Sequence, residues 1–133
     1  MDKLRLEIEE REDGSLLNKV VIPFINEKSL IDILKDIELE FDKTIAGAYD
    51  GISPEEFLDE FQQRKDKVKS RILECECGCE GCWSFVAKIT EHDDLIEWNH
   101  FEQLHRDNWK YTQIEPFQFD KSEYLEELEK LKA

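Results

Sequence analysis

The residues best suited to chemistry are four cysteines, which all lie between Cys75 and Cys82. Cys75 and Cys77 are two residues apart, so both thiols project from the same face of an extended strand. Gly78 and Gly81 permit the positive φ angles that a tight reversal of the chain requires. The spacing therefore predicts a hairpin whose tip gathers three or four sulfur atoms.

Clustered thiolates suit Zn²⁺, which takes four ligands in a tetrahedron and often accepts a histidine as the fourth. The strand expected at 95–104 runs antiparallel to 83–90, so His105 should emerge beside the cysteines. His92 should lie at the far end of the sheet, and His100 falls within a strand. We predict one zinc ion per chain, bound by Cys75, Cys77, Cys82 and His105. Cys79 is an alternative ligand.

Other roles for the thiols stay open at this point. Free cysteines are often simply packed in a core. Cys79 and Cys82 have the C-x-x-C spacing of redox proteins, but no strand followed by a helix surrounds them. If 67–77 is a strand, three basic side chains lie on the same face as Cys75 and Cys77, and their positive charge would lower the pKa of the thiols. These are Lys67, Lys69 and Arg71. Val68 and Ile72 would then face the core, and Leu73 suggests a bulge or burial on both faces.

The chain is acidic, with 33 Asp and Glu against 18 Lys and Arg and a formal charge of −15 over 133 residues. Such a surface disfavours nucleic acid and anionic membranes as partners and favours a basic protein. Solubility alone is the simpler explanation of the same charge. The length predicts one domain, 1–133. Without a long apolar run or an N-terminal leader, we expect a cytoplasmic protein.

Periodicity predicts an α+β fold with antiparallel strands. An N-terminal hairpin is expected from 4–8 and 16–24, with Pro23 at its end or at an edge, and a three-strand meander from 68–77, 83–90 and 95–104. Helices should follow capping patterns at Ser29, Ser53 and Asp120, the last one C-terminal, and 42–52 should be a loop. The simplest arrangement joins all strands into one sheet with the helices on one face. Trp83 and Trp98 are expected in the core or as cross-strand neighbours, and Pro116–Phe119 should pack back on the sheet.

The chain resembles a set of small uncharacterised bacterial proteins that carry C-x-C-G-x-x-G-C-W, W-x-x-F-x-x-x-H-R and P-F-x-F. The first motif runs here from Cys75 to Trp83, with Cys79 on a variable position. The Ala46–Tyr49 loop is also similar to that set. The resemblance implies kinship and a bacterial cytosolic setting, and it leaves the activity open. The matching residues of the later motifs are Trp98, Phe101, His105, Arg106, Pro116, Phe117 and Phe119.

Three functions compete on this evidence. The first is an acidic interaction module, stabilised by zinc at one corner, that binds another protein. The second is a thiol- or zinc-dependent enzyme, redox or hydrolytic, in which His105 and Arg106 act beside the cysteines. The third is a protein that takes up and releases soft metal ions. We favour the first, because the sequence contains no recognisable set of nucleophile, base and orienting group.

Overall fold

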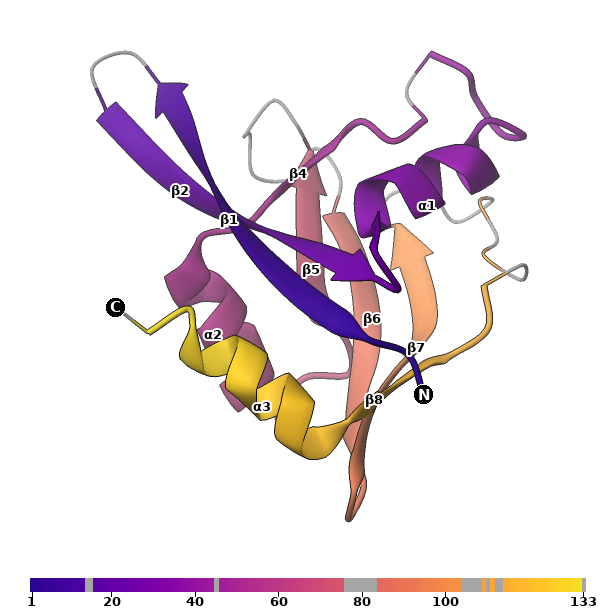
Figure 1. The fold of residues 1–133 in the computed structure, drawn as a ribbon. Helices are drawn as coiled ribbons and strands as arrows, with labels where there is room; N and C mark the ends of the chain where they lie inside the picture. Colours follow the sequence, from indigo (N-terminus) through magenta and orange to yellow (C-terminus); the bar gives the residue numbers. More distant parts are fainter. Residues whose placement is uncertain are drawn as a thin grey trace.

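A computed structural model describes residues 1–13, 16–44, 46–75, 84–103, 109, 111 and 114–132, with the backbone alone for 12–13, 16–18 and 75. The α+β class with antiparallel sheets and a C-terminal helix is confirmed (Figure 1). In chain order, the elements are β1 (Leu4–Asp13), β2 (Leu16–Ile25), β3 (Lys28–Ser29), α1 (Leu30–Glu38), β4 (Tyr49–Gly51), α2 (Pro54–Gln62), β5 (Ser70–Cys75), β6 (Ser84–Glu91), β7 (Leu95–Gln103), β8 (Phe117–Asp120) and α3 (Lys121–Glu129).

Each of the three helices begins where its capping pattern predicts. The side chains of Ser29, Ser53 and Asp120 accept hydrogen bonds from backbone N–H groups three residues further on, which otherwise have no partner in a helix. Pro54 occupies the first turn of α2, where no N–H is needed. Local chemistry therefore sets the helix starts.

The strands form two antiparallel sheets, which corrects the expectation of one continuous sheet. One has the order β1-β2-β3 and the other β4-β5-β6-β7-β8, so the predicted meander β5-β6-β7 gains a strand at each edge. Figure 1 shows the β1–β2 hairpin crossing in front of the larger sheet, with α2 and α3 at one side and α1 at the other.

A backbone seam links the two sheets at the isolated bridge between Val21 and Ile52. The N–H of Val21 donates to the carbonyl oxygen of Ile52 at 2.8 Å. Gly51 lies directly against this seam, and a Cβ there would stand 2.1 Å from the carbonyl oxygen of Val21. The seam therefore requires a residue without a side chain at position 51.

Two further strand predictions need correction. Pro23 does not end β2, because it pairs with Leu6 and the strand continues to Ile25. The alternative of an edge position stands, since β3 pairs with Phe24 and Ile25 but not with Pro23. Val68 precedes β5 and is 83% exposed, so it does not share the core side with Ile72. The predicted bulge is confirmed, because the pairing of β5 with β6 shifts between Arg71 and Leu73, which buries both Ile72 and Leu73.

Trp98 is fully buried, as predicted, and donates its indole N–H to the Tyr124 hydroxyl at 3.0 Å. In α3 and the turn after it, Tyr124, Leu128 and Leu131 are buried, and Leu125 is 39% exposed. Trp83 lies outside the described residues. No helix in the described part of the chain is long and apolar enough to cross a membrane.

Candidate functional site

The strands that lead into the cysteine and His105 segments end together at one end of the five-stranded sheet. Tyr49 pairs with Cys75 and Phe85 pairs with Gln103, which places the end of β5, the start of β6 and the end of β7 side by side. The turn containing His92 joins β6 to β7 at the opposite end, as expected. This arrangement fits the reasoning that singled out His105.

The predicted ligands themselves lie outside the described residues: Cys77, Cys79, Cys82 and His105, together with Arg106 and the side chain of Cys75. The zinc site and the thiol-based alternatives therefore stay predictions. Within the ranges that the structure describes, no group of three or more His, Cys, Asp and Glu side chains is arranged to hold a metal ion. His100 lies in β7 and is exposed.

The cations expected beside the thiols are engaged with carboxylates instead. Lys67 and Lys69 precede β5, and their ammonium groups lie 2.7 Å from Glu60 and 2.9 Å from Glu102. Arg71 is within β5 and pairs with Glu56 and Glu74. The basic stretch therefore ties the chain to its own acidic residues.

A buried polar network lies at the same end of the sheet. The Glu38 side chain, at the end of α1, is fully buried. One carboxyl oxygen accepts from the Gly47 N–H at 3.0 Å, and the other accepts from the hydroxyls of Tyr49 at 2.5 Å and Tyr111 at 2.7 Å. Gln103 Nε2 donates to the Tyr49 hydroxyl at 2.6 Å. The network thus joins α1, the loop before β4, β4 itself and the last residue of β7.

The network is held by hydrogen bonds among buried side chains. Among the described residues, Gln103 Oε1 is buried without a hydrogen-bond partner. Burial raises the pKa of Tyr49, and the neighbouring Glu38 raises it further. Burial also raises the pKa of Tyr111, with Tyr49 as the next cause. We interpret the network as a clamp that fixes the strand ends from which the cysteine and His105 segments start.

The sequence did not predict this network, because its acids were interpreted as an acidic surface. The available signal was the position of Glu38, four residues after Leu34, on the apolar face of α1. Gly47 and Tyr49 fall within the loop predicted at 42–52, which gave no sign that they contact Glu38. An acid on an apolar helix face, with tyrosines elsewhere in the chain, is a pattern worth testing in other sequences.

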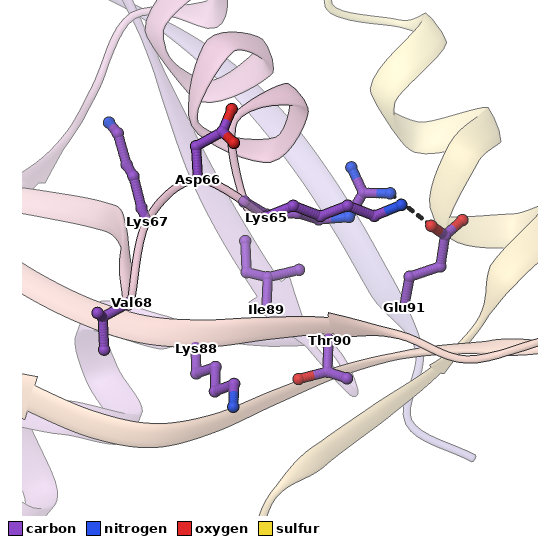
Figure 2. Close-up of a pocket in the computed structure, with 9 residues that line it drawn as sticks. Lys65, Asp66, Lys67, Val68, Lys88, Ile89, Thr90 and Glu91 are labelled. Atoms are coloured by element: carbon purple, nitrogen blue, oxygen red, sulfur yellow. Dashed lines mark hydrogen bonds and ion pairs between the residues drawn. The ribbon is translucent and has the colours of Figure 1, made fainter.

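A surface hollow of about 560 Å³ lies between the loop at 64–68 and residues 88–91 of β6. Figure 2 shows Lys65 extending over Ile89 toward Glu91, with Lys67 directed away from that side. Arg64 donates to Glu91 at 2.6 Å, and Lys121 approaches the same carboxylate at 2.8 Å. Hydrogen bonds from Lys121 and then Arg64 lower the pKa of Glu91 to about 2. These contacts fasten the loop to the sheet.

The tyrosines provide a pH prediction. All three are buried, and burial raises the pKa of Tyr49, Tyr111 and Tyr124 above 10. An unfolded tyrosine ionises near pH 10 while the folded one keeps its proton, so the unfolded state binds fewer protons above that pH. The stabilisation is therefore complete below about pH 10 and is lost as the pH rises further.

We expect the ultraviolet absorbance of tyrosinate to appear only when the chain unfolds, whereas the denatured chain titrates near pH 10. Reversible ionisation of the tyrosines near pH 10, with unchanged circular dichroism, would contradict the buried network.

Comparison of the chain with protein-family models, with curated proteins and with solved structures found no match.

Proposed function

We propose that this chain is an acidic interaction module that binds a basic protein, with a zinc ion reinforcing one end of its larger sheet. The observation that carries the proposal is the pair of neighbouring helices α2 and α3, whose outer faces are acidic. The helices lie side by side in Figure 1, and the rings of Phe61 and Tyr124 are 5.3 Å apart. Their exposed acids are Glu55, Glu56, Asp59, Glu123, Glu126 and Glu129.

Most of this acidic charge is available to a partner. Within the described residues, Glu56 pairs with Arg71 and Glu129 pairs with Lys132, and the other four acids have no ion pair. The basic residues between Arg64 and Arg71 mostly form ion pairs within the chain, as Lys67, Lys69 and Arg71 show. A cationic partner would therefore be attracted by the negative charge of α2 and α3, most of which the chain's own basic residues do not neutralise.

Charge reversal on α2 tests this proposal, with polylysine as the probe and polyglutamate as its control. We expect the double variant Glu55→Lys, Asp59→Lys to bind polylysine at least about tenfold more weakly at low salt, measured by titration calorimetry. Binding by the unaltered chain should weaken steeply between about 0.05 M and about 0.5 M salt, because exposed charges are screened.

The control is Asp32→Lys, Asp36→Lys on α1, which makes the same change in net charge on a helix elsewhere in the fold and also removes the ion pair between Asp36 and Lys28. In both pairs one acid lies in the first turn of its helix, so dipole effects are similar. Equal weakening by both double variants would show that net charge alone drives binding. Absence of polylysine binding at low salt would reject the module.

The zinc ion is the second part of the proposal. Its support is the convergence of the ends of β5, β6 and β7, together with a donor set of three cysteines and one histidine that suits Zn²⁺. Cys75, Cys77, Cys82 and His105 would hold the ion. A closed site of this kind contributes stability and keeps the intervening segment compact.

Exchange of Cys77→Ser should release the metal and lower the melting temperature while the fold persists, because the described core lies elsewhere. The measurements are elemental analysis of protein purified without chelator and a thermal melt. Cys79→Ser is the matched control and should retain the metal. Zinc-free unaltered protein, or a full zinc content in Cys77→Ser, would exclude this ligand set.

A further inference from the structure

The outer edge of β1 is an open strand edge. β1 pairs with β2 over its whole length, from Leu4 with Ile25 to Asp13 with Leu16. β8 bridges to Asp2, just before β1, and beside β1 itself the described residues include no strand on this side. Figure 1 shows the far half of this hairpin projecting beyond the rest of the fold. An exposed edge of this kind offers backbone donors and acceptors to another chain.

Three observations establish which residues point their backbone groups outward. The Leu6 N–H donates to Glu127 on α3, away from β2. Val21, which pairs with Ile8, donates its N–H away from β1 to Ile52. Pro23, which pairs with Leu6, has no N–H to offer the ladder. In an antiparallel pair this parity alternates, so the backbone groups of Ile8, Glu10 and Glu12 also face outward.

The near half of the edge is covered, whereas the outward N–H groups of the described far half are not. Glu127 satisfies Leu6, and the Glu10 carbonyl accepts from the side chain of Arg11 at 3.2 Å. Among the described residues, the N–H groups of Ile8 and Glu10 have no hydrogen-bond partner. Ile8 is also 41% exposed, although it continues the core-facing series that begins with Leu4 and Leu6.

The negative charge along this edge indicates which kind of chain could pair with it. β1 carries five acids against two arginines, a net charge of −3. Of the acids whose side chains are described, Glu10 is exposed, and Glu7 and Glu9, with side chains that are 44% exposed, pair with these arginines. The two arginines of β1 are engaged within the chain: Arg5 with Glu7 and Glu27, and Arg11 with Glu9 and Asp50. A second copy of β1 would place these acids opposite themselves, which is unfavourable. An extended basic segment is the complementary occupant.

We propose that β1 binds a basic, extended segment of another protein as an additional strand, through the backbone groups of Ile8, Glu10 and Glu12. This inference rests on the proposed function, because it states how the basic partner docks. Ile8 supplies an apolar contact, and the glutamates flank the added strand. α3 lies beside the near half of the same edge, through the contact between Glu127 and Leu6, so its acids adjoin the docking surface.

The test uses a peptide that alternates lysine with threonine or valine, and the same peptide with alternate backbone nitrogens methylated. Methylation removes the ladder hydrogen bonds and keeps the charge. The matched protein variants are Glu10→Pro and Glu10→Gln, which both remove the same carboxylate. Glu10→Pro also removes the outward N–H, and proline is compatible with an edge position that donates nothing to β2.

We expect Glu10→Pro to bind the unmethylated peptide at least about tenfold more weakly, and Glu10→Gln to lose less than about threefold. The methylated peptide should bind the unaltered chain as weakly as the unmethylated peptide binds Glu10→Pro. Circular dichroism and a thermal melt check that both variants are folded. If Glu10→Pro does not fold, the comparison of the two peptides on the unaltered chain decides the question.

Equal binding of the methylated and unmethylated peptides, or equal losses in the two variants, would overturn strand addition. The proposed function would then still stand if Glu55→Lys, Asp59→Lys weakens polylysine binding. Failure of polylysine binding in the unaltered chain would instead remove the proposed function itself.

Discussion

Replacement of Gly51 by alanine is expected to destabilise the chain by about 3 kcal/mol or more, enough to unfold much of it. The added Cβ would lie 2.1 Å from the carbonyl oxygen of Val21 and 2.7 Å from its carbonyl carbon. Both are backbone atoms of the bridge that joins the two sheets, so no rotation of a side chain relieves the overlap. Urea titration followed by circular dichroism measures the loss of unfolding free energy.

The control is Gln62→Ala, a substitution at an exposed site in α2, which should change stability by less than about 0.5 kcal/mol. Gly47→Ala is an intermediate case, because its φ is +71° and its Cβ would lie 2.7 Å from the Cβ of Lys35. Unchanged stability in Gly51→Ala would show that β4 does not approach Val21 as described.

Glu38→Gln is the second substitution with a large expected effect, a loss of about 3 kcal/mol of unfolding free energy. Three donors meet the Glu38 carboxyl group: the Gly47 N–H and the hydroxyls of Tyr49 and Tyr111. A glutamine offers one oxygen and one NH₂ group, so in either orientation at least one of these buried donors loses its acceptor. Denaturant titration again gives the change.

Tyr111→Phe removes one of the three donors and leaves Glu38 with the other two, so it should cost only about 1 kcal/mol. Glu126→Gln makes the same chemical change as Glu38→Gln at an exposed site on α3 and should be nearly neutral. Similar small effects for Glu38→Gln and Glu126→Gln would mean that the Glu38 side chain is not enclosed by the network.

Local signals were sufficient for the helices and the long strands. Ser29, Ser53 and Asp120 each satisfy N–H groups within their own turn, so the pattern needs no knowledge of the rest of the chain. β6 and β7 were recognised because apolar residues recur along them. Their core position follows from side chains such as Phe85 and Trp98, which are fully buried.

The short strands depend on tertiary pairing and could not be predicted in this way. β4 consists of Tyr49, Asp50 and Gly51. Asp and Gly are depleted in strands, and this segment is extended because β5 lies beside it. β3 follows a turn in which Asn26 and Glu27 have φ values of 52° and 69°, a conformation uncommon for a glutamate. The two-sheet arrangement also follows from such pairings.

The candidate site also has a part that the sequence predicts and a part that depends on distant contacts. The convergence of the strands that lead to Cys75 and His105 followed from counting antiparallel connections, and the described strand ends agree. The burial of Glu38 could not be inferred from the sequence. Its hydrogen-bond donors belong to Gly47, Tyr49 and Tyr111, and no local pattern indicates that these residues contact Glu38. Acids are exposed by default, and only distant partners reverse that preference.

The seam between Val21 and Ile52 has a consequence for how the chain folds. The hairpins β1–β2, β5–β6 and β6–β7 each pair neighbouring segments and can form early, whereas the seam requires the two sheets to dock. Contacts that form after the transition state affect the unfolding rate and leave the folding rate nearly unchanged. Stopped-flow kinetics of Gly51→Ala should therefore show faster unfolding at a nearly constant folding rate, and slower folding would instead place the docking of the sheets in the nucleus.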